Sequence, residues 1–244
     1  MRETPFTLAN AAPLQPEPML LKLSIIMPTL NEADNIVTAL TALQPLRQQG
    51  HEVIVSDGGS SDATVTLAEP LVDKVIHCER GRALQMNSGA AQASGDVLLF
   101  LHADTQLPDN AAQLIEAALN QKTWGRFDVC LSGPQPLLRL IEFMMNWRSR
   151  LTGICTGDQA IFIRQGLFRA VGGFPAIALM EDIAISSRLK IQNRPARITT
   201  TVISSSRRWE HRGILRTVVL MWSLRLAYFF GSDPERLAER YQKR

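Results

Sequence analysis

The chain has 244 residues, of which 45% are hydrophobic and 20% charged, a balance typical of a soluble protein large enough for one sizeable core. Its three cysteines, Cys78, Cys130 and Cys155, include no Cys-x-x-Cys pair, which argues against a disulfide framework or a zinc site and favours a reducing cytoplasm. No stretch of 18 or more apolar residues is free of charge, so a membrane-spanning helix is not expected.

The net charge of +3 is unevenly distributed along the chain. Residues 1–125 have 7 basic and 14 acidic residues and a net charge of −7, whereas residues 126–244 have 19 and 9 and a net charge of +10. The second half is therefore the expected side for an anionic partner, such as a phosphate, an acidic acceptor or a membrane surface. Nucleic acid is not expected, because the basic residues neither form a run nor alternate with aromatic residues.

Residues 1–20 contain four prolines and no basic start followed by an apolar stretch, so we expect a flexible leader rather than a signal peptide. Residues 21–244 are expected to form one domain. Asn31 is a good N-cap for the first helix, Ser60 or Ser61 for the second, and Pro108 suits the first turn of a later one. Strands are predicted from short apolar runs over 23–27, 52–56, 74–77 and 97–101. Alternating strands and helices predict an α/β fold with a mostly parallel sheet and helices on both faces.

Polar loops follow three of these strands, and the carboxyl ends of parallel strands share one edge of the sheet. We therefore expect these loops to converge on one cleft. Each loop also has a structural explanation, because Asn31 caps a helix, Gly58-Gly59 permits a tight turn, and Asp104 can start the turn toward Pro108. The loop residues of interest are Pro28, Thr29, Asn31, Glu32, Asp57, Gly58, Gly59, His102 and Asp104.

The loops contain neither Gly-x-Gly-x-x-Gly nor a P-loop motif, which argues against a dinucleotide dehydrogenase and a P-loop NTPase. A nucleotide could still bind if Asp57 accepts hydrogen bonds from its base or ribose and a metal at Asp104 bridges its phosphates. Arg82, at an expected helix N-terminus, could contact the same phosphates. A surface arginine without a ligand is the alternative.

Four motifs, in this order along the chain, resemble those of the family-2 inverting glycosyltransferases, which have the GT-A fold. They are Pro28-Thr29-Leu30-Asn31-Glu32, Asp57-Gly58-Gly59-Ser60-Ser61-Asp62, His102-Ala103-Asp104 and Glu181-Asp182. Further matches are similar to a subgroup named for arsenosugar biosynthesis: Gly81-Arg82-Ala83, Gly157-Asp158-Gln159, Met180-Glu181-Asp182 and Ser206-Arg207-Arg208-Trp209-Glu210. The resemblance covers residues 22–230 and implies a Rossmann-like GT-A domain with a nucleotide-sugar half over 21–125 and an acceptor half with C-terminal helices over 126–244.

The resemblance implies a metal-assisted transfer of a sugar, with inversion, from a nucleoside-diphosphate donor, expected to be UDP-linked, to a hydroxyl of an unidentified acceptor. Asp182 matches the family's base, and Glu181 beside it would orient the acceptor or the base. Asp104 would hold Mg2+ or Mn2+ and neutralise the leaving diphosphate. The family's usual metal motif is Asp-x-Asp, and His102 stands at its first position, so His102 would bind the metal directly or through water.

The second half has further residues of interest. Gly157, Asp158 and Gln159 are expected near the acceptor, although Asp158 also suits a turn. Acidic residues such as Glu181 and Asp182 are also favoured in a helix's first turn by its dipole. A diphosphate or a sugar could be held by cationic and aromatic side chains, with an ordinary loop salt bridge as the alternative: Arg207, Arg208 and Trp209.

Two largely apolar segments, 137–145 and 214–230, contain few charged residues. The usual explanation is a helix packed in the core or at a dimer contact. The alternative is peripheral contact with the inner face of a membrane, with arginines toward the lipid phosphates. Together with His102, these segments leave a second functional hypothesis, a nucleotide-sugar-binding scaffold without catalysis in a membrane-associated glycan assembly. A sugar nucleotidyltransferase is disfavoured, because residues 29–35 are acidic and lack glycine.

Overall fold

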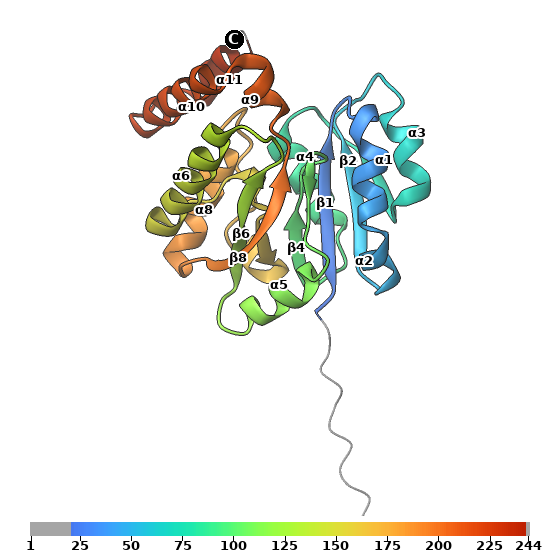
Figure 1. Ribbon diagram of the computed structural model, residues 1–244. Helices are drawn as coiled ribbons and strands as arrows, with labels where there is room; N and C mark the ends of the chain where they lie inside the picture. The colour runs from blue at the N-terminus through green and yellow to red at the C-terminus, as the bar shows by residue number, and fades with distance from the viewer. Residues whose placement is uncertain (1–20, 243–244) are drawn as a thin grey trace, which may run out of the picture.

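The structure, a computed structural model, describes residues 21–242, without the side chains of Arg208, His211, Arg212 and Gln242. The predicted leader, residues 1–20, lies outside this range. The described residues form an eight-stranded sheet with the strand order β3-β2-β1-β4-β7-β6-β8-β5 (Figure 1). The strands are β1 (Leu23–Thr29), β2 (Glu52–Asp57), β3 (Lys74–His77), β4 (Val97–Phe100), β5 (Thr105–Gln106), β6 (Trp124–Leu131), β7 (Phe162–Arg164) and β8 (Ala196–Ser204).

The first four strands run parallel to one another, as the alternating pattern predicts. The short β7 is antiparallel to both β4 and β6, β8 is parallel to β6, and β5 is antiparallel to β8. The predicted mostly parallel α/β sheet is confirmed. The carboxyl ends of β1, β2 and β4 lie at one edge, which places the three polar loops together.

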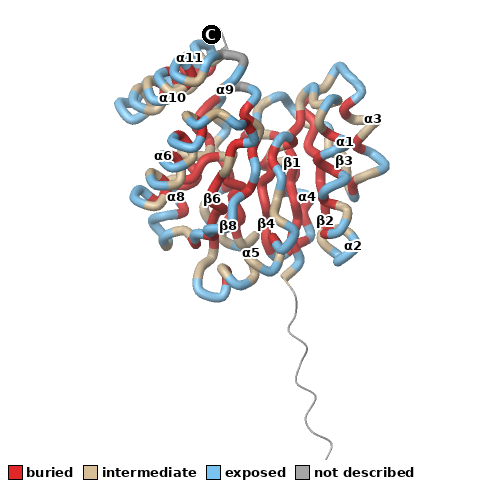
Figure 2. Tube along the Cα trace, in the orientation of Figure 1, coloured by how far each residue is buried: buried red, intermediate tan, exposed pale blue. Residues whose placement is uncertain are grey.

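Helices cover both faces of the sheet, and the strands alternate their side chains between two buried cores (Figure 2). Ile25 and Met27 of β1 face one core, whereas Ile26 between them faces the other, as expected for a period of two. The first core is closed by α1 (Ala33–Ala42), α2 (Gln44–Gln48), α3 (Thr64–Ala68), α5 (Ala111–Leu119) and α6 (Pro136–Thr152). The second is closed by α4 (Arg82–Gln92), α7 (Gln165–Ala170) and α8 (Glu181–Gln192).

Three further helices follow β8: α9 (Arg207–Arg212), α10 (Ile214–Phe229) and α11 (Pro234–Gln242). In Figure 1, α10 and α11 lie against each other beyond the end of the sheet. Leu220 and Leu224 of α10 pack with Leu237 of α11 and with Leu179 and Met180 before α8. Within residues 21–242, none of the helices is long and apolar enough to cross a membrane. The C-terminal helices therefore form a separate small core next to the site.

The segments 137–145 and 214–230 fall on α6 and α10, and core packing accounts for only one side of each helix. Leu138, Ile141 and Met145 of α6 are buried, and so are Leu220 and Leu224 of α10. The opposite sides carry large apolar residues that are exposed: Leu140, Phe143, Trp147 and Leu151 on α6, and Leu215, Val219, Trp222, Leu226 and Phe229 on α10. Core packing therefore accounts for one side of each helix, and the predicted dimer contact or membrane contact stays a prediction for the other side.

Three predicted helix starts differ from the structure. Asn31 has a φ of 54° and precedes the N-cap of α1, so it does not cap this helix. Ser60 does not cap α3, because its hydroxyl donates to Asp57 Oδ1 at 2.5 Å and accepts from the Asn31 N–H at 2.8 Å. Pro108 lies before α5, which begins at Ala111. For Asn31 and Ser60, contacts between the two loops outweigh a local capping preference.

Polar side chains of α6 cover an edge of β6 that no strand pairs with. The Asn146 amide accepts from Val129 N–H and donates to Val129 C=O, both at 2.9 Å. One turn earlier, the Glu142 carboxylate accepts from Leu131 N–H. The side chains satisfy backbone groups that a neighbouring strand would otherwise satisfy, which protects the edge from pairing with another chain. This arrangement fixes α6 beside the cleft.

Glu52 at the start of β2 connects several elements through a buried carboxylate, 6% exposed. It accepts from Ser24 Oγ at 2.6 Å and from Ser94 N–H at 2.9 Å, and it pairs with Lys74 Nζ at 2.9 Å. Burial by itself would raise the pKa of Glu52, but these hydrogen bonds outweigh burial and hold the pKa at about 2. The ionised carboxylate therefore stabilises the fold.

Replacing Glu52 with glutamine is expected to lower the free energy of unfolding by about 3 kcal/mol at neutral pH, the value of its pKa depression. The stabilisation that comes from the depressed pKa is complete above the ordinary value of 4.5, and it is lost as the pH falls toward about 2. The free energies of unfolding of wild type and E52Q should be measured with urea at pH 7 and pH 3. Their difference should be less than half as large at pH 3, about 1 kcal/mol. E69Q, at an exposed glutamate, serves as the control. An equal loss at both pH values would contradict this account.

Candidate active site

The loops after β1 and β2 are held together by hydrogen bonds between them. The Asn31 N–H donates to Ser60 Oγ at 2.8 Å, and Asn31 Oδ1 accepts from the Ser61 N–H at 2.9 Å. The Glu32 N–H donates to Thr64 Oγ1 at 2.7 Å. The structure thus brings the first two predicted motifs together, as the shared sheet edge implies.

Asp57 is 1% exposed and holds the loop that follows it. Its carboxylate accepts from the N–H groups of Gly59 and Ser60 at 2.9 and 2.8 Å, from Ser60 Oγ, and from Thr29 Oγ1 at 3.3 Å. Pro28, Thr29, Asn31, Glu32, Asp57, Gly58 and Gly59 line none of the cavities found near Asp104. Contact of Asp57 with a base or ribose remains a prediction.

Gln85 of α4 is buried and supports the loops after β1 and β2, a role that the sequence did not indicate. Its Nε2 donates to the carbonyls of Thr29 at 2.6 Å and Ser56 at 3.0 Å, at the ends of β1 and β2. A Cβ at Gly58 would lie only 2.9 Å from the Gln85 side chain, so glycine is required for this close approach. A glutamine within a helix of small residues carries no signal for such a role.

The main cleft lies where the third motif meets the second half of the chain, and it contains about 900 Å³ of space open to solvent. It brings together predicted residues from five segments: Arg82, His102, Asp104, Gly157, Asp158, Glu181, Asp182 and Trp209. Asp104 also lines a neighbouring cavity, together with Arg207. The carboxylate of Asp104, in the loop between β4 and β5, therefore stands at the junction of the two cavities.

Arg82 and Glu181 form an ion pair across the cleft, although 98 residues separate them in the chain. Arg82 Nη1 lies 3.1 Å from Glu181 Oε1, and the glutamate side chain is only 3% exposed, whereas that of the arginine is 41% exposed. Burial raises the pKa of Glu181, the neighbouring Asp182 adds to this, and Arg82 opposes it. Arg82 therefore neutralises Glu181 and still presents part of its guanidinium to the cleft.

Asp182, the predicted base, is held in place by two backbone donors. Its Oδ2 accepts from the Gly157 N–H at 3.1 Å, and its Oδ1 accepts from the Ile183 N–H at 2.7 Å. The second bond lies in the first turn of α8, where the helix dipole favours a carboxylate. The structure thus shows both the predicted helix-start role and a cleft position for Asp182.

His102, in the loop after β4, packs against Gly157, whose N–H donates to Asp182. A Cβ at Gly157 would lie 2.5 Å from His102 Cε1, so only glycine permits this contact. The His102 Nδ1 lies 3.7 Å from Asp158 Oδ1. Burial lowers the pKa of His102, and Arg82 lowers it further against the nearby carboxylates. The imidazole is therefore neutral near pH 7 and has a ring nitrogen suited to a metal.

Three non-glycine residues in the described chain have a positive φ, and each adjoins a predicted motif. They are Asn31 at 54°, Ala160 at 46° and Met180 at 72°. This region is unfavourable for residues with a Cβ, and such strain concentrates at functional sites. Met180 immediately precedes Glu181 and Asp182, so the strained residue sets where α8 begins and where its two carboxylates lie.

Several predicted residues lie to the side of the cleft. Gln159 is fully buried and caps its own turn, accepting from the Thr156 N–H at 3.2 Å. Arg207 lines the neighbouring cavity, where its Nε donates to Ser205 Oγ at 3.2 Å. The side chain of Arg208 lies outside the described residues. Of the three predicted cationic and aromatic groups, Trp209 is the one seen in the main cleft.

The residues around Asp104 fit a divalent cation bound jointly with a ligand. Within the described residues, no group of three His, Cys, Asp or Glu is close enough to form a metal site by itself. Mg2+ in phosphate-transferring sites commonly uses only one or two carboxylates together with substrate phosphates and water. Asp104 is exposed, and the one hydrogen bond found for its carboxylate in the described region is a long contact of 3.4 Å from Thr105 Oγ1. Its oxygens are therefore available.

Comparison with known proteins gives related sequences over much of the chain. A glycosyltransferase of PGL/p-HBAD biosynthesis from Mycobacterium bovis is 32% identical over 171 residues, covering 62% of each chain. A dolichol-phosphate mannosyltransferase from Pyrococcus furiosus is 34% identical over 108 residues, 41% of this chain and 31% of that protein. A glycosyltransferase of Mycobacterium tuberculosis matches at 33% identity over 54% of this chain, which spans 47% of its length. The chain thus spans about half the length of these relatives.

Solved structures share the fold at lower identity. A mannosyltransferase from Pyrobaculum calidifontis in complex with GDP-Man and Mn2+ gives a TM-score of 0.64 at 20% identity, over 91% of this chain and 69% of that one. TarS 1-349 of S. aureus in complex with UDP-GlcNAc gives a TM-score of 0.62 at 19% identity, over 76% of this chain and 58% of that one. The model of the family described as Glycosyl transferase family 2 matches residues 24–170. The narrower arsenosugar subgroup remains a prediction. The chain therefore belongs to glycosyl transferase family 2 and has the GT-A fold.

Proposed function

We propose that this enzyme transfers a sugar, with inversion at the anomeric carbon, from a UDP-linked sugar to an acceptor hydroxyl. The observation that carries the proposal is the convergence of Arg82, Asp104 and Asp182 on one cleft. Structural neighbours support the donor class, since they are complexes with UDP-GlcNAc, with GDP-Man, or with UDP and Mn2+ or Mg2+. The nucleotides in these neighbours differ in base, and the uridine assignment rests on the motif resemblance.

Asp182 is proposed as the general base. The acceptor hydroxyl attacks the anomeric carbon, its proton passes to a carboxylate oxygen of Asp182, and the bond to the leaving diphosphate breaks on the opposite face. The N–H groups of Gly157 and Ile183 hold this carboxylate in one orientation, which provides the positioning that such a step needs. Glu181, neutralised by Arg82, is proposed to orient the acceptor or the base.

Asp104, with His102 as a second ligand directly or through water, is proposed to hold Mg2+ or Mn2+. When bound, the ion would act as a Lewis acid that stabilises the charge on the leaving diphosphate. The partly exposed guanidinium of Arg82 lines the same cleft and would add a cation for the phosphates. Arg207, in the neighbouring cavity that shares Asp104, is suited to the same role.

Thermal unfolding with UDP-, GDP-, CDP- and dTDP-sugars, with and without Mn2+, tests the donor assignment. A ligand that binds only the native state raises Tm, so UDP-sugars with Mn2+ should give the largest increase. Release of UDP in the presence of an acceptor extract then tests the transfer. Stabilisation by a GDP-sugar alone would replace the uridine assignment, and no stabilisation by any donor would overturn the proposed site.

We also propose that the protein stays in the cytoplasm and binds the inner face of the membrane peripherally. Its three cysteines are unpaired, and residues 126–244 have a net charge of +10. The exposed apolar side chains of α6 and α10 include Phe143, 61% exposed, and Phe229, 81% exposed. Contiguous exposed apolar surface with basic residues around it is typical of a membrane-contacting surface.

Co-sedimentation with phosphatidylcholine vesicles containing phosphatidylglycerol should recover the protein in the pellet at low salt. Replacing both Phe143 and Phe229 with serine should weaken binding about tenfold or more, because each buried phenylalanine contributes about 1.5–3 kcal/mol. Ile191→Ser provides a matched control, since Ile191 is 80% exposed but lies on α8. Full recovery of the wild type in the supernatant at low salt would reject membrane binding.

A further inference from the structure

A groove runs between α6 and α10, and both helices present the same pattern of side chains to it. Each contributes three apolar residues and then an arginine, at the spacing i, i+3, i+4 and i+7 that defines one helix face. The arginines are Arg148 and Arg225. The apolar residues are Ile141, Met144 and Met145 from α6 and Val218, Met221 and Trp222 from α10. The groove encloses about 530 Å³ of space open to solvent.

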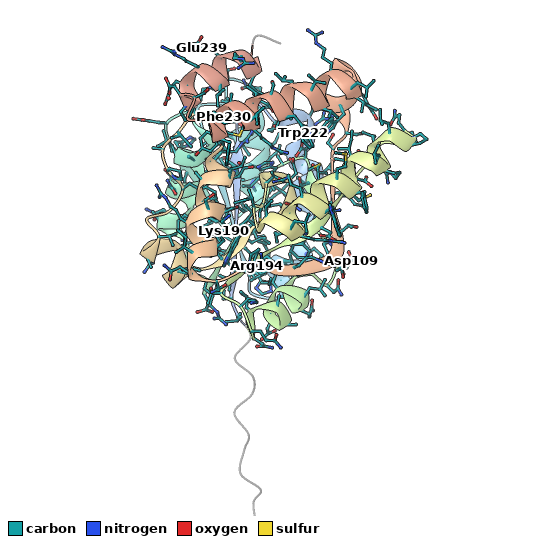
Figure 3. The ribbon with its side chains drawn as sticks, turned by 90° about the vertical axis from the view of Figure 1, so that its left-hand side faces the viewer. Asp109, Lys190, Arg194, Trp222, Phe230 and Glu239 are labelled. Atoms are coloured by element: carbon teal, nitrogen blue, oxygen red, sulfur yellow. The ribbon has the colours of Figure 1, made fainter. Side chains whose placement is uncertain are left out.

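The groove is continuous with the candidate active site. Four residues line both the groove and the main cleft: Asp158, Trp209, Met221 and Arg225. In Figure 3, α10 crosses above α6, and Trp222 lies between the two helices. A molecule in the groove would therefore reach the cleft that contains Asp182 without crossing the donor loops after β1 and β2.

Both arginines of the groove have buried nitrogen atoms without a partner. Among the described residues, Nε and Nη2 of Arg148 and Nε of Arg225 form no hydrogen bond, and neither guanidinium lies within ion-pair distance of a carboxylate. Burial lowers the pKa of Arg148 to about 10, and the nearby charge of Arg225 adds to this. Two neighbouring cations with buried, unsatisfied donors form a site that an anion would stabilise.

The outer rims of the groove are apolar as well. Trp222 is 57% exposed and Met144 39% exposed, and both belong to the groove and to the exposed surfaces of α10 and α6. Apolar chains favour such a surface because burial removes them from water. A purely apolar partner, such as a second copy of the same helices, would leave Arg148 and Arg225 without an anion.

We propose that the acceptor of this glycosyltransferase is an amphipathic anion, a lipid-like molecule that has a phosphate and, at its polar end, the hydroxyl that attacks the anomeric carbon. Its apolar chain would lie in the groove between α6 and α10, and its phosphate would bind Arg148 and Arg225. This assignment rests on the proposed function, because it names the acceptor class of the same site. The shared wall at Arg225 then places the polar end of the acceptor at the entrance to the cleft.

Binding of three probes to the full chain tests the proposal: decyl phosphate below its critical micelle concentration, inorganic phosphate, and neutral decyl glucoside. Isothermal titration should show that decyl phosphate binds most tightly. Arg148→Gln and Arg225→Gln should each weaken its binding about tenfold or more, the contribution of a charge-assisted hydrogen bond, with little effect on decyl glucoside. Val218→Glu should weaken both alkyl probes.

Two variants on the same helix are matched controls. Arg216→Gln and Val219→Glu change exposed residues of α10 that do not line the groove, and both should bind decyl phosphate like the wild type. Circular dichroism and the Tm shift with UDP-sugar and Mn2+ show that each variant folds and keeps its donor site. The two arginine variants test the same contact independently if one of them fails to fold.

The outcomes separate the acceptor proposal from the proposed function. Donor binding without tighter binding of decyl phosphate than of inorganic phosphate would overturn the lipid-like acceptor and leave the donor assignment intact. Decyl phosphate binding that is lost in the groove variants supports the acceptor proposal even if no tested donor binds. Sedimentation equilibrium showing a dimer that Val218→Glu dissociates would instead assign the groove to a second copy and overturn the proposal.

Discussion

Replacing Asp182 with asparagine is expected to lower kcat by about 10²- to 10⁴-fold, the usual contribution of a general base. Asparagine has nearly the same shape and keeps one oxygen that can accept from the N–H of Gly157 or Ile183, so the start of α8 should persist. The variant loses only the carboxylate that takes the acceptor proton. UDP release measured at saturating donor should therefore fall, while the Tm increase on donor binding should remain.

Asp109→Asn is the matched control for D182N, because Asp109 lies in the loop before α5, away from the cleft (Figure 3). Its UDP release should equal that of the wild type. Full activity of D182N, with donor binding retained, would remove Asp182 from the base role and make Asp158 the next candidate, since it lines the same cleft. Loss of donor binding as well would show that Asp182 acts on the donor.

The architecture was largely predictable because short apolar runs mark buried strands. The runs at 23–27 and 97–101 fall on β1 and β4, and the alternation of strands and helices predicted their parallel pairing. The antiparallel β7, only three residues long, was not predicted, because its order in the sheet depends on contacts between distant segments. The hydrogen bonds between the Asn146 amide and the β6 backbone were not predictable for the same reason.

The site was predictable where a motif follows a strand and not where it depends on tertiary pairing. Asp104, in the loop after β4, lines the cleft as expected. The contact of Arg82 with Glu181 joins segments far apart in sequence, and no local pattern indicates it. Gln159 shows the converse: its motif position suggested the acceptor, but its amide caps a buried turn. A motif identifies a loop more reliably than it identifies which side chain faces the ligand.

Replacing Asp104 with asparagine is expected to lower kcat/KM by about 10²- to 10³-fold, the usual loss when one stabilising group for a leaving anion is removed. The carboxylate stands where both cavities meet, so its charge is available to a cation held with the donor diphosphate. A neutral amide keeps the shape and removes that charge. Calorimetric titration of Mn2+ in the presence of UDP should therefore show a large loss of affinity in D104N.

Two further variants decide what a loss in D104N means. Asp96→Asn changes an aspartate at the opposite end of β4, where its carboxylate accepts from the Lys22 N–H at 3.0 Å, and Mn2+ affinity should not change. His102→Asn should give a smaller loss than D104N if the imidazole binds through water, and a comparable loss if it binds directly. Unchanged Mn2+ affinity in D104N would exclude Asp104 as the principal metal ligand. Because His102 occupies the first position of the usual Asp-x-Asp motif, this comparison also shows whether a neutral imidazole replaces a carboxylate there.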